Sequence, residues 1–222
     1  MRSLVTACAV AFASILWATP PAAAQSFGQS FLPRVALGHD VAPGAPGQTL
    51  AWIRQAGLAE HGGDIRSAMS GYQNAAAVLN QPGVAQDPYP PASQSASFFL
   101  LRAYAETAQA RLAVTYPNVF TNARFAVSAA TTARSDYLRA LGLVQSRAAA
   151  NPLPADRANL ASIYRSLGYV DSIVAPLETV RGDLSNAQSI DPASGAKTAS
   201  LARGLDRAMA QMRAHPQLSR SL

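Results

Sequence analysis

One helical hairpin, residues 49–82, constrains the fold of this chain more than any other stretch. Its first half places Trp52 and Ala56 four residues apart, and its second half continues with apolar residues three or four apart. Residues so spaced share one face of an α-helix. The two halves are separated by Gly62 and Gly63, which readily adopt the positive φ angles that end a helix. The stretch therefore predicts two antiparallel helices, which need further helices to cover their apolar face.

The same hairpin resembles a tetratricopeptide repeat, a helix–turn–helix unit of 34 residues. Its span from Thr49 to Pro82 has this length, although Gln55 stands where leucine is usual and Asn80 where proline is usual. Asp64 is placed to cap the second helix by accepting backbone N–H bonds. The residues that carry the resemblance are Trp52, Ala56, Ala59, Gly63, Ile65, Ala68, Tyr72 and Ala75.

In a second stretch, residues 159–192, two segments resemble parts of a longer unit of the same kind: residues 159–170 resemble its first helix and turn, and residues 186–192 resemble its end. The resemblance puts its turn at Leu167-Gly168. The helix that follows is about seven residues longer than in the repeat, which is two helical turns. Pro176 lies inside this helix and predicts a kink, because proline removes a backbone hydrogen bond. The matching residues are Leu160, Ala161, Tyr164, Leu167, Gly168, Asn186, Ala187, Asp191 and Pro192.

Two longer helices are expected between these stretches. The first, residues 95–115, ends at Tyr116-Pro117, because the residue before a proline avoids helical dihedral angles. The second is capped by Asn118 or Thr121 and runs to about residue 150. The buried stripe expected in the first helix consists of Phe98, Leu101, Tyr104, Ala105, Ala108 and Leu112.

A last helix, residues 192–215, resembles the helix that caps a repeat stack. We therefore expect an all-α domain over residues 49–215, with about seven helices. The helices would stack as hairpins in a short tetratricopeptide-like array or form an irregular helical bundle. Residues 25–48, rich in proline and glycine, predict a flexible tether before the domain, and residues 216–222 a mobile tail.

The first 24 residues have the pattern of a secretory signal peptide. Arg2 gives a positive start, residues 4–17 are apolar, and Ala24 precedes the expected cleavage site at Gln25. The apolar run is too short for a transmembrane helix. We therefore expect a periplasmic or secreted protein with no transmembrane anchor after cleavage, and an uncleaved anchor is the alternative.

Charge and cysteine content exclude several classes of function. The chain carries 18 basic and 12 acidic residues, and loss of Arg2 with the signal peptide leaves a net charge of +5. Basic residues are scattered rather than gathered with aromatic ones, which excludes a nucleic-acid interface and leaves a weak attraction to anionic surfaces. Cleavage also removes Cys8, so the mature chain has no disulfide and no thiolate site. The arginines expected on solvated helix faces are Arg102, Arg111, Arg124, Arg134, Arg139 and Arg147.

No sequence motif points to catalysis. Ser194 and Lys197 match the Ser-x-x-Lys motif of penicillin-recognising enzymes, but the further motifs of those enzymes are missing. Glu60, His61 and Asp64 share one turn, where a polar turn explains them better than a metal site. We therefore expect no catalytic residue, no metal and no cofactor, and the chain is predicted not to be an enzyme.

The leading hypothesis is an exported, non-catalytic helical protein that acts as a protein-binding or scaffolding module in the bacterial envelope. Tetratricopeptide repeats bind extended peptides along the concave face formed by their first helices, so the expected partner is another envelope protein or a peptide. An ordinary solvated residue is the alternative for each candidate contact. By resemblance, the outward positions are Ile53, Glu60 and His61 in the first unit, and Ser162, Arg165 and Ser166 in the second.

Two other functions stay open. An enzyme of unrecognised type would be indicated by Glu106, Asp136 or Asp171 gathered with a histidine in one cleft. A plain helical bundle would instead bind a small apolar ligand or a stress-related partner. The pocket of such a bundle would be lined by Phe98, Phe99, Phe120 and Phe125.

Overall fold

The computed structural model describes the central part of the chain, where all regular structure is helical. The described residues are 45–81, 96–116, 118–120, 122–153, 156–192, 198–199 and 203. The expected signal peptide, most of the expected tether, nearly all of the last expected helix and the tail lie outside these ranges. The all-α prediction is confirmed, because the described ranges contain six helices and no strand.

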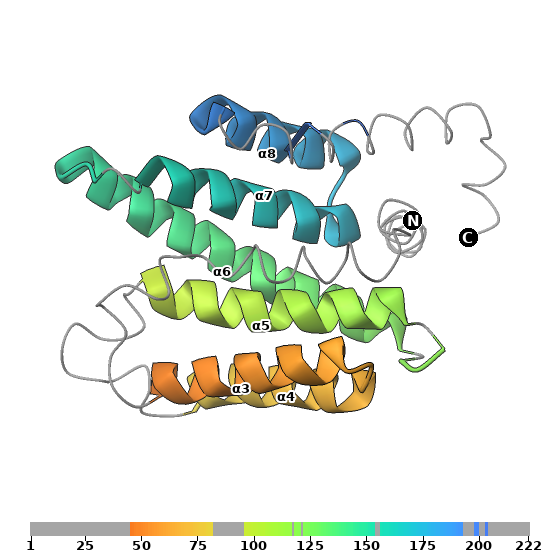
Figure 1. The fold of residues 1–222 in the computed structure, drawn as a ribbon. Helices are drawn as coiled ribbons and strands as arrows, with labels where there is room; N and C mark the ends of the chain where they lie inside the picture. The colour runs from red at the N-terminus through yellow and green to blue at the C-terminus, as the bar shows by residue number, and fades with distance from the viewer. Residues whose placement is uncertain are drawn as a thin grey trace, which may run out of the picture.

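The six helices form three hairpins that stack in a row (Figure 1). The main contacts join successive helices, with a smaller contact between α3 and α5. Figure 1 shows α3 and α4 at one end of the row and α8 at the other. Contacts restricted to neighbours are characteristic of stacked helical hairpins. The hairpins are α3 (Ala45–His61) with α4 (Ile65–Leu79), α5 (Ala96–Thr115) with α6 (Ala123–Ala150), and α7 (Asp156–Val174) with α8 (Leu177–Ile190).

The first hairpin has the turn and the cap that its sequence predicts. Gly63 has a φ of 81°, which glycine adopts without strain. The Asp64 side chain accepts a hydrogen bond from the Ser67 backbone N–H at 3.1 Å. The helices cross at Gly71, where an added Cβ would lie 2.8 Å from the Cβ of Ala56. Small residues therefore set the distance between α3 and α4.

The first helix begins at Ala45 rather than at Thr49. The end of the predicted tether is therefore helical, and that boundary is wrong. The reason is the position of Pro46, because the first turn of a helix tolerates the fixed φ and missing N–H of proline. Thr49 then lies within the helix, and its hydroxyl donates a hydrogen bond to the carbonyl of Ala75 in α4 at 3.4 Å.

The central helix α5 is buried along most of its surface. Its predicted stripe is confirmed, but residues outside the stripe, such as Leu100, Ala103 and Ala110, are equally buried. A helix that is apolar all round belongs in the interior of a structure. Accordingly, α5 packs against α4 on one side and α6 on the other, as Figure 1 shows.

The start of α6 corrects one prediction. Its N-cap is Asn122, whose side-chain oxygen accepts a hydrogen bond from the Arg124 backbone N–H at 3.1 Å. Neither Asn118 nor Thr121 is the N-cap. The backbone N–H groups of Val119 and Phe120 donate hydrogen bonds to the carbonyl of Tyr116, and this turn comes before the helix starts. The helix then runs to its predicted end.

The turn of the third hairpin is displaced from its predicted position. Helix α7 continues through Gly168 to Val174, and the chain turns at Ala175 and Pro176. Both the predicted turn at Gly168 and the predicted kink at Pro176 are therefore wrong. Pro176 has an extended backbone and stands before α8 as its N-cap. Gly168 allows a close crossing instead, because an added Cβ would lie 3.1 Å from Cδ2 of Leu184.

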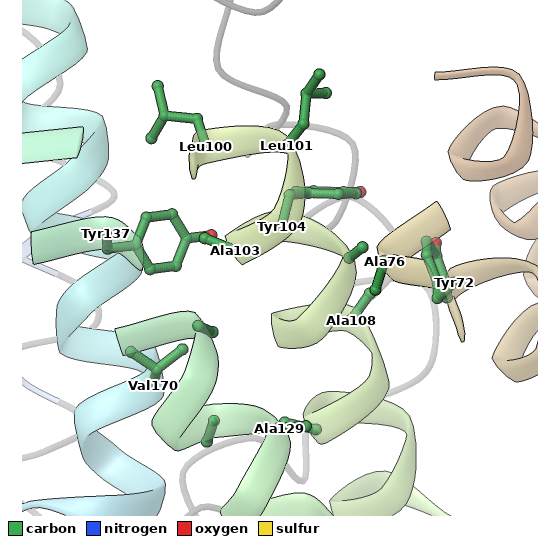
Figure 2. Packing of buried hydrophobic residues seen from close by; sticks show 14 of the residues in the cluster. Tyr72, Ala76, Leu100, Leu101, Ala103, Tyr104, Ala108, Ala129, Tyr137 and Val170 are labelled. Carbon is green, nitrogen blue, oxygen red and sulfur yellow. The ribbon is translucent and has the colours of Figure 1, made fainter. Parts of the chain in front are cut away.

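Alanines and tyrosines are prominent in the core that joins the hairpins (Figure 2). One continuous cluster of buried residues extends from α3 to α7. The rings of Tyr72 and Tyr104 meet edge to face with centroids 6.4 Å apart, and Figure 2 shows Tyr137 pointing towards α5 beside Ala103. Alanines bring the backbones together while the large rings fill the remaining space. The buried apolar residues of α8 lie outside this cluster; they are Val180, Leu184 and Ala187.

Candidate functional site

Three of the six predicted partner-binding positions are buried. Ile53, Glu60 and Ser166 are 2%, 8% and 4% exposed, so the prediction that they face outward is wrong. Ile53 belongs to the continuous core. The Ser166 hydroxyl donates a hydrogen bond to the carbonyl of Ser162 at 3.0 Å. These positions are covered by the neighbouring helices of the same chain and are not available to a partner.

The other three positions are partly accessible, but they lie on two different helices. His61 is exposed at the end of α3, whereas Ser162 and Arg165 are half-buried in α7. In the polar turn after α3, both carboxylates have partners other than His61. Glu60 bonds to an arginine inside the protein and Asp64 caps α4, so neither carboxylate is available to share a ligand with His61.

The most deeply buried ion pair joins Glu60 of α3 to Arg111 of α5. Nη1 of Arg111 lies 2.5 Å from Oε1 of Glu60, and Nη2 lies 2.7 Å from Oε2. This geometry fits the guanidinium fork to both carboxylate oxygens, which makes the bond strong. The hydroxyl of Tyr72, from α4, donates a further hydrogen bond to Glu60 Oε2 at 3.2 Å. One buried carboxylate thus links three helices.

The titratable groups around this ion pair keep their protons at neutral pH. Burial raises the pKa of Tyr104 to about 12, and it also raises the pKa values of Tyr72 and of Tyr169 in α7. Burial acts to lower the pKa of Arg111, but the hydrogen bonds and charge of Glu60 raise it. A general acid or base needs a pKa near the working pH. The cluster is therefore suited to holding helices together rather than to proton transfer.

Other arginines reach from one helix to a carboxylate on the next. Arg102 of α5 donates two hydrogen bonds, of 2.6 and 2.7 Å, to Asp136 of α6. Arg134 of α6 bonds to Asp171 of α7 at 2.6 Å, and both of these aspartates are 1% exposed. The expectation of solvated arginines is therefore wrong for Arg102, Arg111 and Arg134, which are buried or half-buried and pair with a buried carboxylate on another helix. Arg147 is exposed as expected, although it also pairs with the buried Asp156 of α7.

Two of these ion pairs have a second carboxyl group beside them. Burial raises the pKa of Glu106 in α5 to about 7, and the charge of Asp136 acts in the same direction. Burial and a hydrogen bond with Asp171 raise the pKa of Asp183 in α8 to about 7, against the effect of Arg134. The one arginine in each group can neutralise only one of its two carboxyl groups, so the second favours its neutral form.

The phenylalanines expected to line an apolar pocket serve as packing. The rings of Phe98 and Phe99 meet edge to face with centroids 5.4 Å apart. The guanidinium carbon of Arg102 lies 5.2 Å from the centre of Phe98, and that of Arg139 lies 5.6 Å from the centre of Phe99. Such contacts are favourable cation–π interactions. The other two rings of the set are half-buried against the core; they are Phe120 and Phe125.

The carboxylates that would indicate an enzyme have arginines as their charged partners rather than a histidine. Asp136 pairs with Arg102 and Asp171 with Arg134, while Glu106 lies beside Asp136. In the described part of the chain, no three His, Cys, Asp or Glu side chains gather so that they could hold a metal ion. None of the described helices combines the length and apolarity needed to cross a bilayer.

The fold defines an all-α class of protein, a row of three helical hairpins joined by buried arginine–carboxylate pairs. The chain matches no protein-family model, and no curated protein or solved structure is significantly similar to it. The tetratricopeptide resemblance remains a prediction. It is carried by the first hairpin, because the second stretch turns at a different residue from the one expected.

Three residues that shape these clusters were not predicted from the sequence. Arg111 gave a signal, because it stands between Ala110 and Leu112 in a helix of apolar residues, and a charged residue so placed needs a buried partner. Tyr169 and Asp183 gave no such signal. Asp183 meets Asp171 across the turn of the third hairpin, and the sequence resemblance misplaced that turn.

Proposed function

We propose that this chain is an exported, non-catalytic helical module that binds a protein partner and acts as a scaffold in the bacterial envelope. The proposal rests on the row of hairpins, in which buried polar side chains pair with one another and hold the helices together. In the described residues these pairs lack the histidine or metal-ligand cluster of a reactive centre. Rows of helical hairpins offer extended surfaces to partners.

The exposed surface favours an acidic partner. Among the described residues, eight arginines are exposed but only two carboxylates, Asp64 and Glu178. The other described acids are buried or half-buried, so the surface is more basic than the composition suggests. Opposite charge on a partner speeds and orients association. The eight exposed arginines are Arg54, Arg66, Arg124, Arg139, Arg147, Arg157, Arg181 and Arg203.

The outward face of α3 is the surface that we assign to the partner. Arg54, Leu58 and His61 are exposed and three or four residues apart, so they share this face. Leu58 is 75% exposed, more than any other large apolar side chain of the described residues. A leucine beside an arginine suits an acidic segment of a partner that also has an apolar side.

Capture from envelope extracts with the mature chain tests this assignment. We expect a partner protein that is retained at low salt, released as salt rises, and lost with the double variant Arg54→Glu, Leu58→Ser. The matched control is Arg124→Glu, Leu138→Ser, which makes the same changes at exposed positions of α6. Equal capture by both variants contradicts the α3 surface. Capture no different from that of an unrelated basic protein contradicts the binding function.

Export is tested separately by fractionation and by sequencing the N-terminus of the mature protein. We expect the protein outside the cytoplasm with Gln25 as its first residue, because Ala22-Ala23-Ala24 form the expected cleavage site. Recovery from the cytoplasm with Met1 still in place contradicts export. Recovery in the membrane fraction with residues 1–24 intact favours the uncleaved anchor instead.

A further inference from the structure

The third hairpin is attached to the row differently from the other two. Among the described residues, helix α8 packs chiefly on α7, and its buried apolar side chains lie outside the continuous core that extends from α3 to α7. Its N-cap, Pro176, makes no side-chain hydrogen bond. A helix with few contacts beyond one neighbour opens at a lower free energy than the core. The interface between α7 and α8 therefore decides how firmly α8 is held.

Two carboxyl groups meet at that interface. Asp171 of α7 is almost fully buried and bonds to Nε of Arg134 through its Oδ1. Asp183 of α8 interacts with Asp171 across this interface, and its Oδ2 is buried without a hydrogen-bond partner among the described residues. The close crossing at Gly168 brings Asp183 here, since an added Cβ on this glycine would lie 3.7 Å from the Cβ of Asp183.

We propose that Asp183 is a proton-dependent latch: in the closed third hairpin it is a neutral carboxylic acid that donates a hydrogen bond to the Asp171 carboxylate, and loss of that proton loosens α8 from α7. Two ionised carboxylates would repel each other and would have no donor between them. The proton supplies the missing donor. The inference concerns how firmly α8 is held on α7, and it does not depend on the proposed partner.

The direction of the pH effect follows from the two states of Asp183. In the closed hairpin, burial and the contact with Asp171 raise the pKa of Asp183 to about 7, whereas a detached helix would leave the carboxyl at about 4. The closed state thus binds the proton more tightly. Its stabilising effect is complete below about pH 4, is lost as the pH rises to about 7, and is absent above that. One proton changes the opening equilibrium by at most about tenfold per pH unit.

The other charged groups on the packed helices do not cause the same effect. Arg134 of α6 favours the ionised form of Asp183 and so opposes the latch. Arg165 of α7 faces Asp191 at the far end of α8, which is a contact between opposite charges. Among the described residues, Asp171 is the carboxyl group that acts on Asp183. The proton-dependent closure is therefore a property of this one pair.

Hydrogen exchange of the full mature chain between about pH 5 and 8.5 tests the latch. Protection of α8 is measured relative to the unfolded chain, which removes the intrinsic pH dependence of exchange. We expect protection of α8 to fall several-fold per pH unit up to about pH 7 and then to level off. In Asp183→Asn the amide can donate to Asp171 without a titrating proton, so protection of α8 should become independent of pH. The matched control is Glu106→Gln, which removes the other raised carboxyl group and should leave the behaviour of α8 unchanged.

Two results would overturn the proposal. One is α8 protection that varies with pH in Asp183→Asn as it does in the parent chain, or that does not vary in the parent. The other comes from carbon-13 NMR of the parent chain and needs no variant. There we expect the Asp183 carboxyl to titrate near its raised pKa of about 7, and a midpoint near the ordinary value of about 4 excludes the latch.

Discussion

The first and third hairpins cross in similar ways but meet different neighbours at the crossing. Each has a glycine inside a helix where its partner helix comes closest, Gly71 in α4 and Gly168 in α7. Opposite Gly71 stand the backbone and Cβ of Ala56, which cannot move independently of α3. Opposite Gly168 stands the end of the Leu184 side chain, which can rotate. The first crossing is therefore rigid and the third adaptable.

The buried charges also distinguish the two hairpins, because they are balanced in the first and unbalanced in the third. Glu60 of the first hairpin is matched one to one by Arg111, with a tyrosine hydroxyl as a further donor. In the third hairpin Asp171 and Asp183 share a single arginine. A balanced pair needs no extra proton, whereas two carboxyl groups beside one arginine do. Burial raises the pKa of Asp183, and the neighbouring Asp171 raises it further, so the third hairpin is the one expected to respond to pH.

The largest expected effect comes from removing the arginine of the balanced pair. Arg111→Met leaves Glu60 buried without its counter-charge, which should lower the free energy of unfolding by about 3–5 kcal/mol, measured by urea denaturation. Arg124→Met, at an exposed position of α6, is the control and should change it by less than about 0.5 kcal/mol. Adding Glu60→Gln to Arg111→Met should recover part of the loss. An equal loss of stability in Arg111→Met and Arg124→Met would show that Glu60 and Arg111 do not form a buried ion pair.

The two glycine crossings are compared by the same substitution in each. In Gly71→Ala the new methyl would meet the Cβ of Ala56 at 2.8 Å, so the helices must separate, at a cost of about 1–3 kcal/mol. In Gly168→Ala the neighbour is the movable end of Leu184, and the higher helix propensity of alanine offsets the strain by up to about 1 kcal/mol. We expect Gly168→Ala to stay within about 1 kcal/mol of the parent in urea denaturation. A larger loss at Gly168 than at Gly71 would reverse the comparison.

The helix caps give a smaller difference. Asp64 caps α4 through its side chain, whereas Pro176 before α8 makes no such bond. Asp64→Ala should therefore lower the free energy of unfolding by about 1 kcal/mol, which corresponds to a fall in Tm of about 2–4 °C for a chain of this size. Asp64→Asn keeps an acceptor at the cap and should retain most of the stability. A Tm unchanged in Asp64→Ala would mean that the cap contributes nothing.

The smallest predicted effect is a gain in α8. An added Cβ at Gly182 would have no atom within 4 Å, so Gly182→Ala introduces no strain and should stabilise the helix by up to about 1 kcal/mol. The gain should appear as slower hydrogen exchange of α8. Gly142→Ala, at an equally open site in α6, is the matched control and should leave α8 unchanged. Faster exchange of α8 in Gly182→Ala would contradict the open surroundings of this glycine.

The sequence predicted the features of the fold that depend on neighbouring residues. The positive φ at Gly63 and the cap at Asp64 are set within a few residues, and both were found where expected. The buried stripe of α5 and its end before Pro117 follow from helical spacing and from proline geometry. The all-helical class followed from these local signals.

Features that depend on distant residues could not be read from the same signals. Gly168 looks the same in a sequence whether it makes a turn or admits a neighbouring helix, and only the position of Leu184 distinguishes the two. Arg111 finds its partner 51 residues away, and no local pattern encodes that pairing. The predicted outward positions Ile53 and Glu60 failed for the same reason, because the helices that cover them come later in the chain.

The distance along the chain between Glu60 and Arg111 also limits how the protein can begin to fold. A growing chain that has produced α3 and α4 still lacks the arginine that neutralises Glu60. Until α5 docks, the Tyr72 hydroxyl of α4 is the partner of Glu60 within the first hairpin, and the ion pair with Arg111 cannot form. Full consolidation of the N-terminal hairpin therefore has to wait until α5 is complete and available to dock.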